Sequence, residues 1–160
     1  MSNSCLPQNH KSAQPLIYGY NTLMAEADPQ NAPNVDQAPE VIVVEDDPFI
    51  SRMYEVKLSK AGYHIQMGAS GKDVITLLNT YHPKLALVDI NMPEMTGIEA
   101  IKQLKDTGYD FTKTQIVFLT NSNNPNDIEA AKALGGDYLI KADQTPRGVL
   151  ELIKKKLGQV

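Results

Sequence analysis

The chain has 160 residues, 42% of them hydrophobic, and a formal net charge of −4, so it is long enough for one domain with a filled core. A net negative charge disfavours direct nucleic-acid binding, and the single cysteine excludes an internal disulfide framework. No segment approaches the roughly 18 apolar residues of a membrane span, and the N-terminus lacks the apolar core of a signal peptide. We therefore expect a cytoplasmic protein without membrane insertion.

The first 38 residues are rich in Asn, Gln, Pro, Ser and Ala and show no sustained hydrophobic period. Such a segment buries too little apolar surface to offset the entropy of ordering, so we predict a disordered tail over residues 1–38. An apolar island at residues 16–20 fits either a solvated tail or a short docking motif. The folded domain is then expected at 39–160, with no output domain after it.

From residue 40 onward, strand and helix patterns alternate. The first strand is expected at 41–45, and the helix after it should begin near Pro48 and end at Gly62. A second strand at 63–68 precedes a helix that Ser70 caps. The apolar stripe of the first helix is predicted to comprise Ile50, Met53, Tyr54, Leu58 and Ala61.

The same alternation continues through three more units. Their strands are predicted at 84–89, 115–120 and 137–140. The third helix should begin near Gly97, the fourth should end at the glycine pair 135–136, and the fifth should begin near Thr145. Five such units predict an α/β fold with a doubly wound parallel sheet and helices on both faces.

Reactive side chains stand at the carboxyl ends of four predicted strands. Glu45 and Asp46 close the first strand, Asp89 the third, Thr120 the fourth, and Lys141 follows the fifth. Each has an ordinary explanation alone, such as helix capping for the acids or strand packing for Thr120. Because ligands bind at the carboxyl edge of open α/β sheets, we expect them to converge. Together they supply what phosphoryl transfer to a carboxylate requires: acids for Mg²⁺, an attacking carboxylate, a hydroxyl and an ammonium.

The sequence around these residues resembles the receiver domain of two-component response regulators, including the chemotaxis-type stand-alone receivers. The matching segments are 41–47, 87–97, 116–120 and 137–141. The resemblance covers residues 40 to about 157. It implies a flavodoxin-like (βα)5 fold with strand order 2-1-3-4-5. It also implies a phosphoprotein of phosphorelay signal transduction that turns over no small molecule.

The resemblance assigns roles to the acidic residues. Asp89 corresponds to the phosphoacceptor, and Asp46 and Asp89 correspond to side-chain ligands of Mg²⁺. Glu45 would act on the metal through water, and Asn91 would offer its backbone carbonyl. Asp47 is expected to cap the following helix or to lie at the margin of the site.

The resemblance also implies how the signal is received and passed on. Before phosphorylation Lys141 would pair with Asp89. A histidine kinase or histidine phosphotransfer protein would donate the phosphoryl group, which Thr120 and Lys141 would then contact. Tyr138 resembles the aromatic switch that moves inward with Thr120. A downstream protein would then bind the face formed by the fourth helix, the fifth strand and the fifth helix.

Three positions depart from the common family pattern. Ala142 replaces a proline that is often joined by a cis bond, so we expect a trans bond and a different loop here. Asn121 replaces a small residue and would restrict access to the phosphoryl group, which would alter its lifetime. Thr96 replaces an acid, with an effect expected only on the loop.

Three other function classes remain to be weighed. A phosphohydrolase of the haloacid-dehalogenase type needs a second acid two residues after its nucleophile, where this chain has Asn91. A receiver-like adaptor that accepts no phosphate would not need Asp46, Asp89, Thr120 and Lys141 together. A dinucleotide-binding domain is disfavoured because acids fill the first strand-to-helix turn, where a glycine-rich loop belongs.

Overall fold

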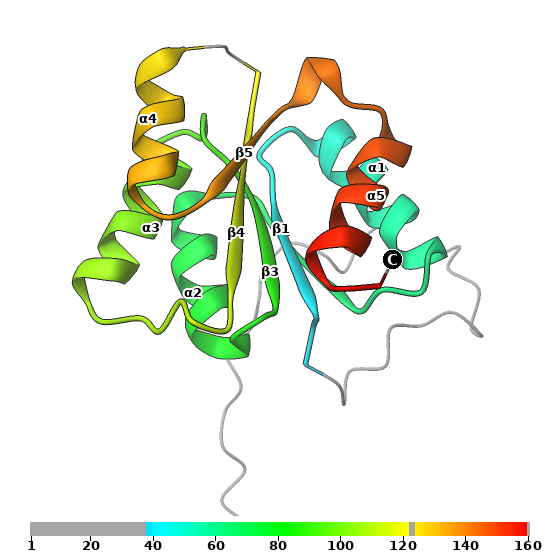
Figure 1. The fold of residues 1–160 in the computed structure, drawn as a ribbon, viewed down its shortest axis with the longest axis horizontal. Coiled ribbons are helices and arrows are strands. Elements are labelled where there is room, and N and C mark those ends of the chain that lie inside the picture. Colours follow the sequence, from blue (N-terminus) through cyan, green and yellow to red (C-terminus); the bar gives the residue numbers. More distant parts are fainter. Residues whose placement is uncertain (1–37, 122–123, 160) are drawn as a thin grey trace, which may run out of the picture. The chain divides into compact units, whose positions relative to one another are not determined.

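Five parallel strands form the centre of the fold, with helices on both faces (Figure 1). The computed structural model describes residues 38–121 and 124–159, so the predicted tail lies outside them except for residue 38. The strands are β1 (Val41–Val44), β2 (Ile65–Gly68), β3 (Leu85–Asp89), β4 (Gln115–Thr120) and β5 (Asp137–Ile140). The helices are α1 (Pro48–Lys60), α2 (Gly71–Tyr81), α3 (Gly97–Asp106), α4 (Pro125–Ala133), the 3₁₀ turn η2 (Lys141–Asp143) and α5 (Pro146–Lys156). The strand order is β2-β1-β3-β4-β5, which confirms the predicted fold.

Side chains alternate between the two faces of the sheet and build one apolar core on each. On one face, α2, α3 and α4 cover a core that includes Val44, Val88 and Phe118. On the other, α1 and α5 cover a core that includes Val43 and Leu87. Because β1 and β3 are buried on both faces, their sequences are continuous apolar runs. None of the described helices is long and apolar enough to cross a membrane.

Helix starts lie close to the carboxyl ends of the strands and are capped locally. Asp47 caps α1 because its Oδ1 accepts hydrogen bonds from the backbone N–H groups of Phe49 and Ile50, at 2.8 and 3.1 Å. Thr96 and Glu99 form a capping box at the start of α3. The cap predicted for Asp47 is confirmed, and Thr96 has a structural role that the sequence interpretation missed.

Two predictions near α1 are wrong: the start of the following strand and the extent of the helix's buried stripe. The second strand begins at Ile65, not at residue 63, because the Tyr63 N–H donates to the Leu58 carbonyl and so belongs to the end of α1. Met53 is 37% exposed, and Ala61 is exposed too, so neither lies in the buried stripe of the helix. The stripe is narrower than predicted because α1 contacts the sheet mainly through Tyr54 and Leu58.

Candidate functional site

Three carboxylates converge at the carboxyl edge of the sheet. Glu45 and Asp46 follow β1, Asp89 ends β3, and each offers an oxygen that lies within 4.8 Å of the other two. Glu45 is 1% exposed and Asp89 is 2% exposed, whereas Asp46 is open to solvent. The predicted convergence of the acids is therefore confirmed, with two of them in the interior and one at the surface.

A single lysine pairs with both buried acids. Lys141 places Nζ 2.7 Å from Asp89 Oδ2 and 2.6 Å from Glu45 Oε2, and its side chain is only 6% exposed. The sequence interpretation paired Lys141 with Asp89 but missed its contact with Glu45. Two strands, β3 and β4, separate β1 from β5 in the sheet, so the shared edge predicted that these residues lie near each other but not that they touch.

Backbone N–H groups hold the second oxygen of each buried carboxylate. The Asn91 N–H donates to Asp89 Oδ1 at 3.2 Å, and the Asp47 N–H donates to Glu45 Oε1 at 3.3 Å. Each carboxylate thus has one oxygen on the ammonium of Lys141 and the other on the loop that follows its own strand. These contacts fix the orientation of both acids.

Burial dominates the titration of this cluster. It raises the pKa of Glu45 to about 7, although the hydrogen bond from Lys141 acts in the opposite direction. Burial also raises the pKa of Asp89. Burial lowers the pKa of Lys141, but its hydrogen bonds to Asp89 and Glu45 outweigh that effect and leave it raised. Burial, followed by the charges of Glu45 and Asp89, raises the pKa of the Tyr54 hydroxyl to about 12.

The raised pKa of Glu45 predicts a pH-dependent stability. Between its ordinary value of 4.5 and its folded value of about 7, the folded protein binds a proton more tightly than the unfolded chain. The free energy of unfolding should therefore fall as the pH rises from 4.5 to about 7 and then level off. A divalent cation that needs the ionised acids should counter this fall, so the stabilisation by Mg²⁺ should grow over the same window.

Urea unfolding at several pH values, with and without Mg²⁺, measures both effects. Glu45→Gln is the matched control, since it removes this titrating group and should remove the part of the metal-free slope that Glu45 causes. A stabilisation by Mg²⁺ that does not change across this window would contradict the prediction.

The acid cluster has the donor set of a hard divalent cation. Three carboxylates against one ammonium leave two negative charges when all are ionised. Oxygen ligands of this kind suit Mg²⁺, which keeps several of its waters and binds through one or two carboxylates. The exposed carboxylate of Asp46 is accessible to such a hydrated ion. The residues present therefore fit a Mg²⁺ site.

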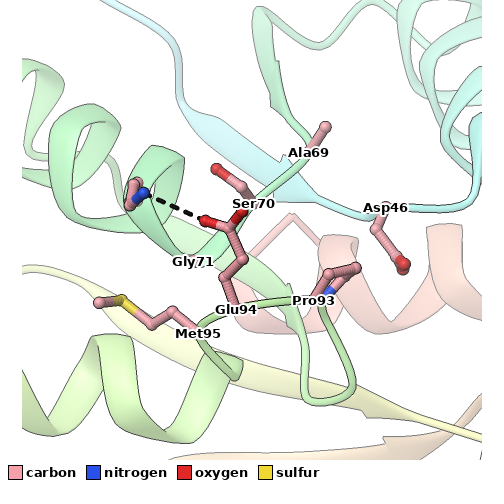
Figure 2. Close-up of a pocket in the computed structure, with 8 residues that line it drawn as sticks. Asp46, Ala69, Ser70, Gly71, Pro93, Glu94 and Met95 are labelled. Carbon is pink, nitrogen blue, oxygen red and sulfur yellow. Dashed lines mark hydrogen bonds and ion pairs between the residues drawn. The ribbon is translucent and has the colours of Figure 1, made fainter.

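A pocket of about 490 Å³ opens beside Asp46. Its other walls are the start of α2 and the loop between β3 and α3, where Glu94 and Met95 lie (Figure 2). The dashed line in Figure 2 is the ion pair between Lys72 Nζ and Glu94 Oε2, at 3.1 Å. Asp46 thus lines this pocket and is exposed to solvent.

The loop that follows Asp89 is held by close backbone packing. The Gly97 N–H donates to the Ile90 carbonyl at 3.0 Å. A Cβ at Gly97 would lie 2.2 Å from the Asp89 carbonyl oxygen, so the start of α3 touches the end of β3 directly. The position of Asp89 thus depends on α3 as well as on its own strand.

Thr120 and Tyr138 lie on the same face of the sheet. Thr120 is fully buried at the end of β4. Phe118, two residues earlier, pairs in register with Tyr138 on β5, so all three side chains point toward the face that carries α4. Tyr138 is half-buried and packs against the core on that face.

The segment after Lys141 has its own shape. Lys141–Asp143 forms the 3₁₀ turn η2, and the peptide bond to Ala142 is trans, as expected from the absence of proline. Ala142 and Asn121 are exposed, while Asn91 is an exposed residue whose N–H reaches Asp89.

Comparison with known proteins places the chain in a family. The response regulator receiver domain family matches residues 41–154. Chemotaxis protein CheY of Thermotoga maritima is 33% identical over 116 residues, which cover 72% of this chain and 94% of that protein. The structure of chemotaxis response regulator CheY4 of Vibrio cholerae is 26% identical, with a TM-score of 0.66 and coverage of 75% of this chain and 99% of that one.

The chain is also similar to part of a longer protein. The transcriptional regulatory protein AfsQ1 of Streptomyces coelicolor is 29% identical over 107 residues, which cover 66% of this chain but only 46% of that protein. The chain thus spans about half the length of this relative. Receiver domains are generally signalling modules that take phosphate from histidine kinases or phosphotransfer proteins. By its fold and its matching residues 41–154, this chain belongs to the receiver domains of two-component response regulators.

Proposed function

We propose that this receiver domain is switched by phosphorylation of Asp89. The observation that carries the proposal is the arrangement around that residue. Asp89 Oδ2 contacts Lys141, Oδ1 accepts from the Asn91 N–H, and Asp46 and Glu45 lie beside it. The phosphodonor would be a phosphohistidine of a histidine kinase or a histidine phosphotransfer protein.

Asp46 and Asp89 would hold Mg²⁺ through their side chains, Asn91 through its backbone carbonyl, and Glu45 through water. The metal would supply positive charge to the phosphoryl oxygens as they approach the acids. Because Glu45 and Asp89 are buried and ionised acids repel each other, that charge also stabilises the acid cluster itself. Of these residues, only Asp89 would be modified in the reaction, and the others would return unchanged.

In the transfer step, a carboxylate oxygen of Asp89 attacks phosphorus and forms an acyl phosphate. The bond from phosphorus to the donor imidazole nitrogen breaks, and the imidazole leaves with the electron pair of that bond. Lys141 exchanges its contact with Asp89 for one with a phosphoryl oxygen. The ion pair with Glu45 keeps the Lys141 ammonium group near the site. The Thr120 hydroxyl donates a hydrogen bond to another phosphoryl oxygen.

The movement of Thr120 would be passed to Tyr138, because both side chains lie on the same face of the sheet. A shift of the Tyr138 ring changes the surface made by α4, β5 and α5, where a downstream protein would bind the phosphorylated form more tightly. Slow hydrolysis of the acyl phosphate would reset the domain. The exposed Asn121 beside Thr120 would influence that rate.

Incubation with Mg²⁺ and acetyl phosphate, followed by intact mass measurement, tests the proposal. We expect a gain of one phosphoryl group in the wild type and none in Asp89→Asn. Asp106→Asn, at an exposed acid that ends α3, is the matched control and should gain the group normally. No gain with any small donor or any phosphohistidine protein would contradict the proposal and favour an adaptor that accepts no phosphate.

A further inference from the structure

Lys132 of α4 lies over the ring of Tyr138. Its Nζ is 5.4 Å from the ring centroid, within the range of about 6 Å over which a cation is attracted to an aromatic face. Lys132 is exposed and Tyr138 is half-buried, so the contact lies at the solvent edge between α4 and β5. No carboxylate among the described residues pairs with Lys132, so the cation–π contact with Tyr138 is the interaction that the structure shows for its ammonium group.

The contact between Lys132 and Tyr138 links α4 to β5, the strand on which α4 packs. Ala131 is the buried residue of that nine-residue helix, so few apolar contacts hold α4 in place. Figure 1 shows α4 beside α3 and β5 at one end of the sheet. A helix anchored so lightly can be biased by a single side-chain interaction.

The contact also bears on the direction in which Tyr138 can move. Lys132 contacts the ring at the exposed surface, whereas Thr120 is fully buried at the end of β4, on the same face of the sheet as Tyr138. Asp89 meanwhile pairs with Lys141 as an unmodified carboxylate. A movement of the ring from this solvent edge toward the fully buried Thr120 would weaken the contact if Lys132 stayed at the surface.

We propose that Lys132 holds Tyr138 in its outer position and so opposes the phosphorylation-dependent switch. This inference rests on the proposed function, because it assigns Lys132 to the regulation of the same site. Lys132 is a positioning residue that acts through Tyr138. Exposed cation–π contacts are weak, so removal of the cation should shift the switch by about two- to five-fold.

The test compares Lys132→Met, Lys132→Arg and Lys105→Met. Methionine keeps an unbranched apolar stem without the charge, and arginine keeps a cation that can face the ring. Lys105 lies in the last turn of α3, as Lys132 does in α4, so Lys105→Met controls for the loss of a charge at a helix C-terminus. Each variant is titrated with BeF₃⁻, a phosphoryl mimic, in Mg²⁺, and the tyrosine ring resonances are followed by NMR.

We expect Lys132→Met to respond at about two- to five-fold lower BeF₃⁻ than the wild type. Its Tyr138 resonances without BeF₃⁻ should also lie partway toward their BeF₃⁻-bound positions. Lys132→Arg and Lys105→Met should match the wild type in both measurements. A Lys132→Met midpoint and ring spectrum equal to those of Lys105→Met would overturn the inference.

The two proposals fail differently in this experiment. A wild type that does not respond to BeF₃⁻ counts against the site at Asp89. In that case, the Tyr138 ring resonances of the variants measured without BeF₃⁻ still show whether Lys132 sets the position of the ring. A wild type that responds, with an unchanged Lys132→Met, removes only the role of Lys132.

Discussion

Lys141→Met is expected to lower the free energy of unfolding at pH 8 by about 3–5 kcal/mol, the range found when one partner of a buried ion pair is removed. The substitution leaves Glu45 and Asp89 without the ammonium that contacts both, at 2.6 and 2.7 Å. Both carboxylates stay buried, so neither can recover its contacts from water. The repulsion between them adds to the loss.

Two conditions should restore part of this stability. Lys141 lowers the pKa of Glu45 through a hydrogen bond and through its charge, so without it the pKa should rise further above about 7. Glu45 then takes up a proton as the pH falls, and the defect should shrink at pH 6. Mg²⁺ should also stabilise this variant more than the wild type, because it supplies the missing positive charge.

Urea unfolding at pH 6 and pH 8, with and without Mg²⁺, measures these differences. Lys84→Met is the matched control, because Lys84 pairs with Glu40 at the surface and its loss should change stability by less than about 1 kcal/mol. Phosphoryl uptake by Lys141→Met should be reduced even in the folded protein. A Lys141→Met defect as small as that of Lys84→Met would show that the buried pairs carry no net stability.

The sequence predicted the site where position along a strand was enough to place a side chain. Asp46, Asp89, Thr120 and Lys141 all stand at strand ends, and in a parallel sheet those ends share one edge. The period of apolar residues predicted the alternation of strands and helices, and the family resemblance implied the strand order that the structure confirms.

Contacts that depend on the reach and rotamer of a long side chain were not predictable in this way. Lys141 reaches Glu45 past two intervening strands, and Lys132 reaches Tyr138 from a neighbouring helix. Helical spacing also overestimated the buried face of α1, because it cannot show how much of a helix the sheet covers, and Met53 lies beyond that limit. The role of Thr96 had a local signal, a Thr followed three residues later by Glu99, that the interpretation did not use.

Gly97→Ala is expected to lower the free energy of unfolding by about 3 kcal/mol or more, at or above the upper end of the range for overpacked cores. The new Cβ would lie 2.2 Å from the Asp89 carbonyl oxygen and 2.7 Å from Val88 Cγ1, whereas real Cβ atoms do not approach other atoms within 3.0 Å. The nearest atom belongs to the backbone, so no side-chain rotation relieves the clash. α3 must move away from β3, and the hydrogen bond from the Gly97 N–H to the Ile90 carbonyl is stretched.

That displacement should also impair the site, because it moves the loop that carries Asn91 and the strand end that carries Asp89. We expect weaker stabilisation by Mg²⁺ and slower phosphoryl uptake in the fraction that remains folded. Gly148→Ala in α5 is the matched control, since the only close contact of its Cβ would be with the flexible end of Gln144, at 2.7 Å, and its contact with Thr145 Oγ1 at 3.6 Å is ordinary. That helical substitution should leave stability unchanged or raise it by up to about 1 kcal/mol.

Urea unfolding and intact mass after acetyl phosphate treatment, performed on both variants, separate the two effects. A general intolerance of added methyl groups near helix starts would destabilise both variants alike. If Gly97→Ala instead retained the stability and the Mg²⁺ response of the wild type, the close contact between α3 and β3 would not be what positions Asp89. Asp89 would then be held by its contacts with Lys141 and the Asn91 N–H alone.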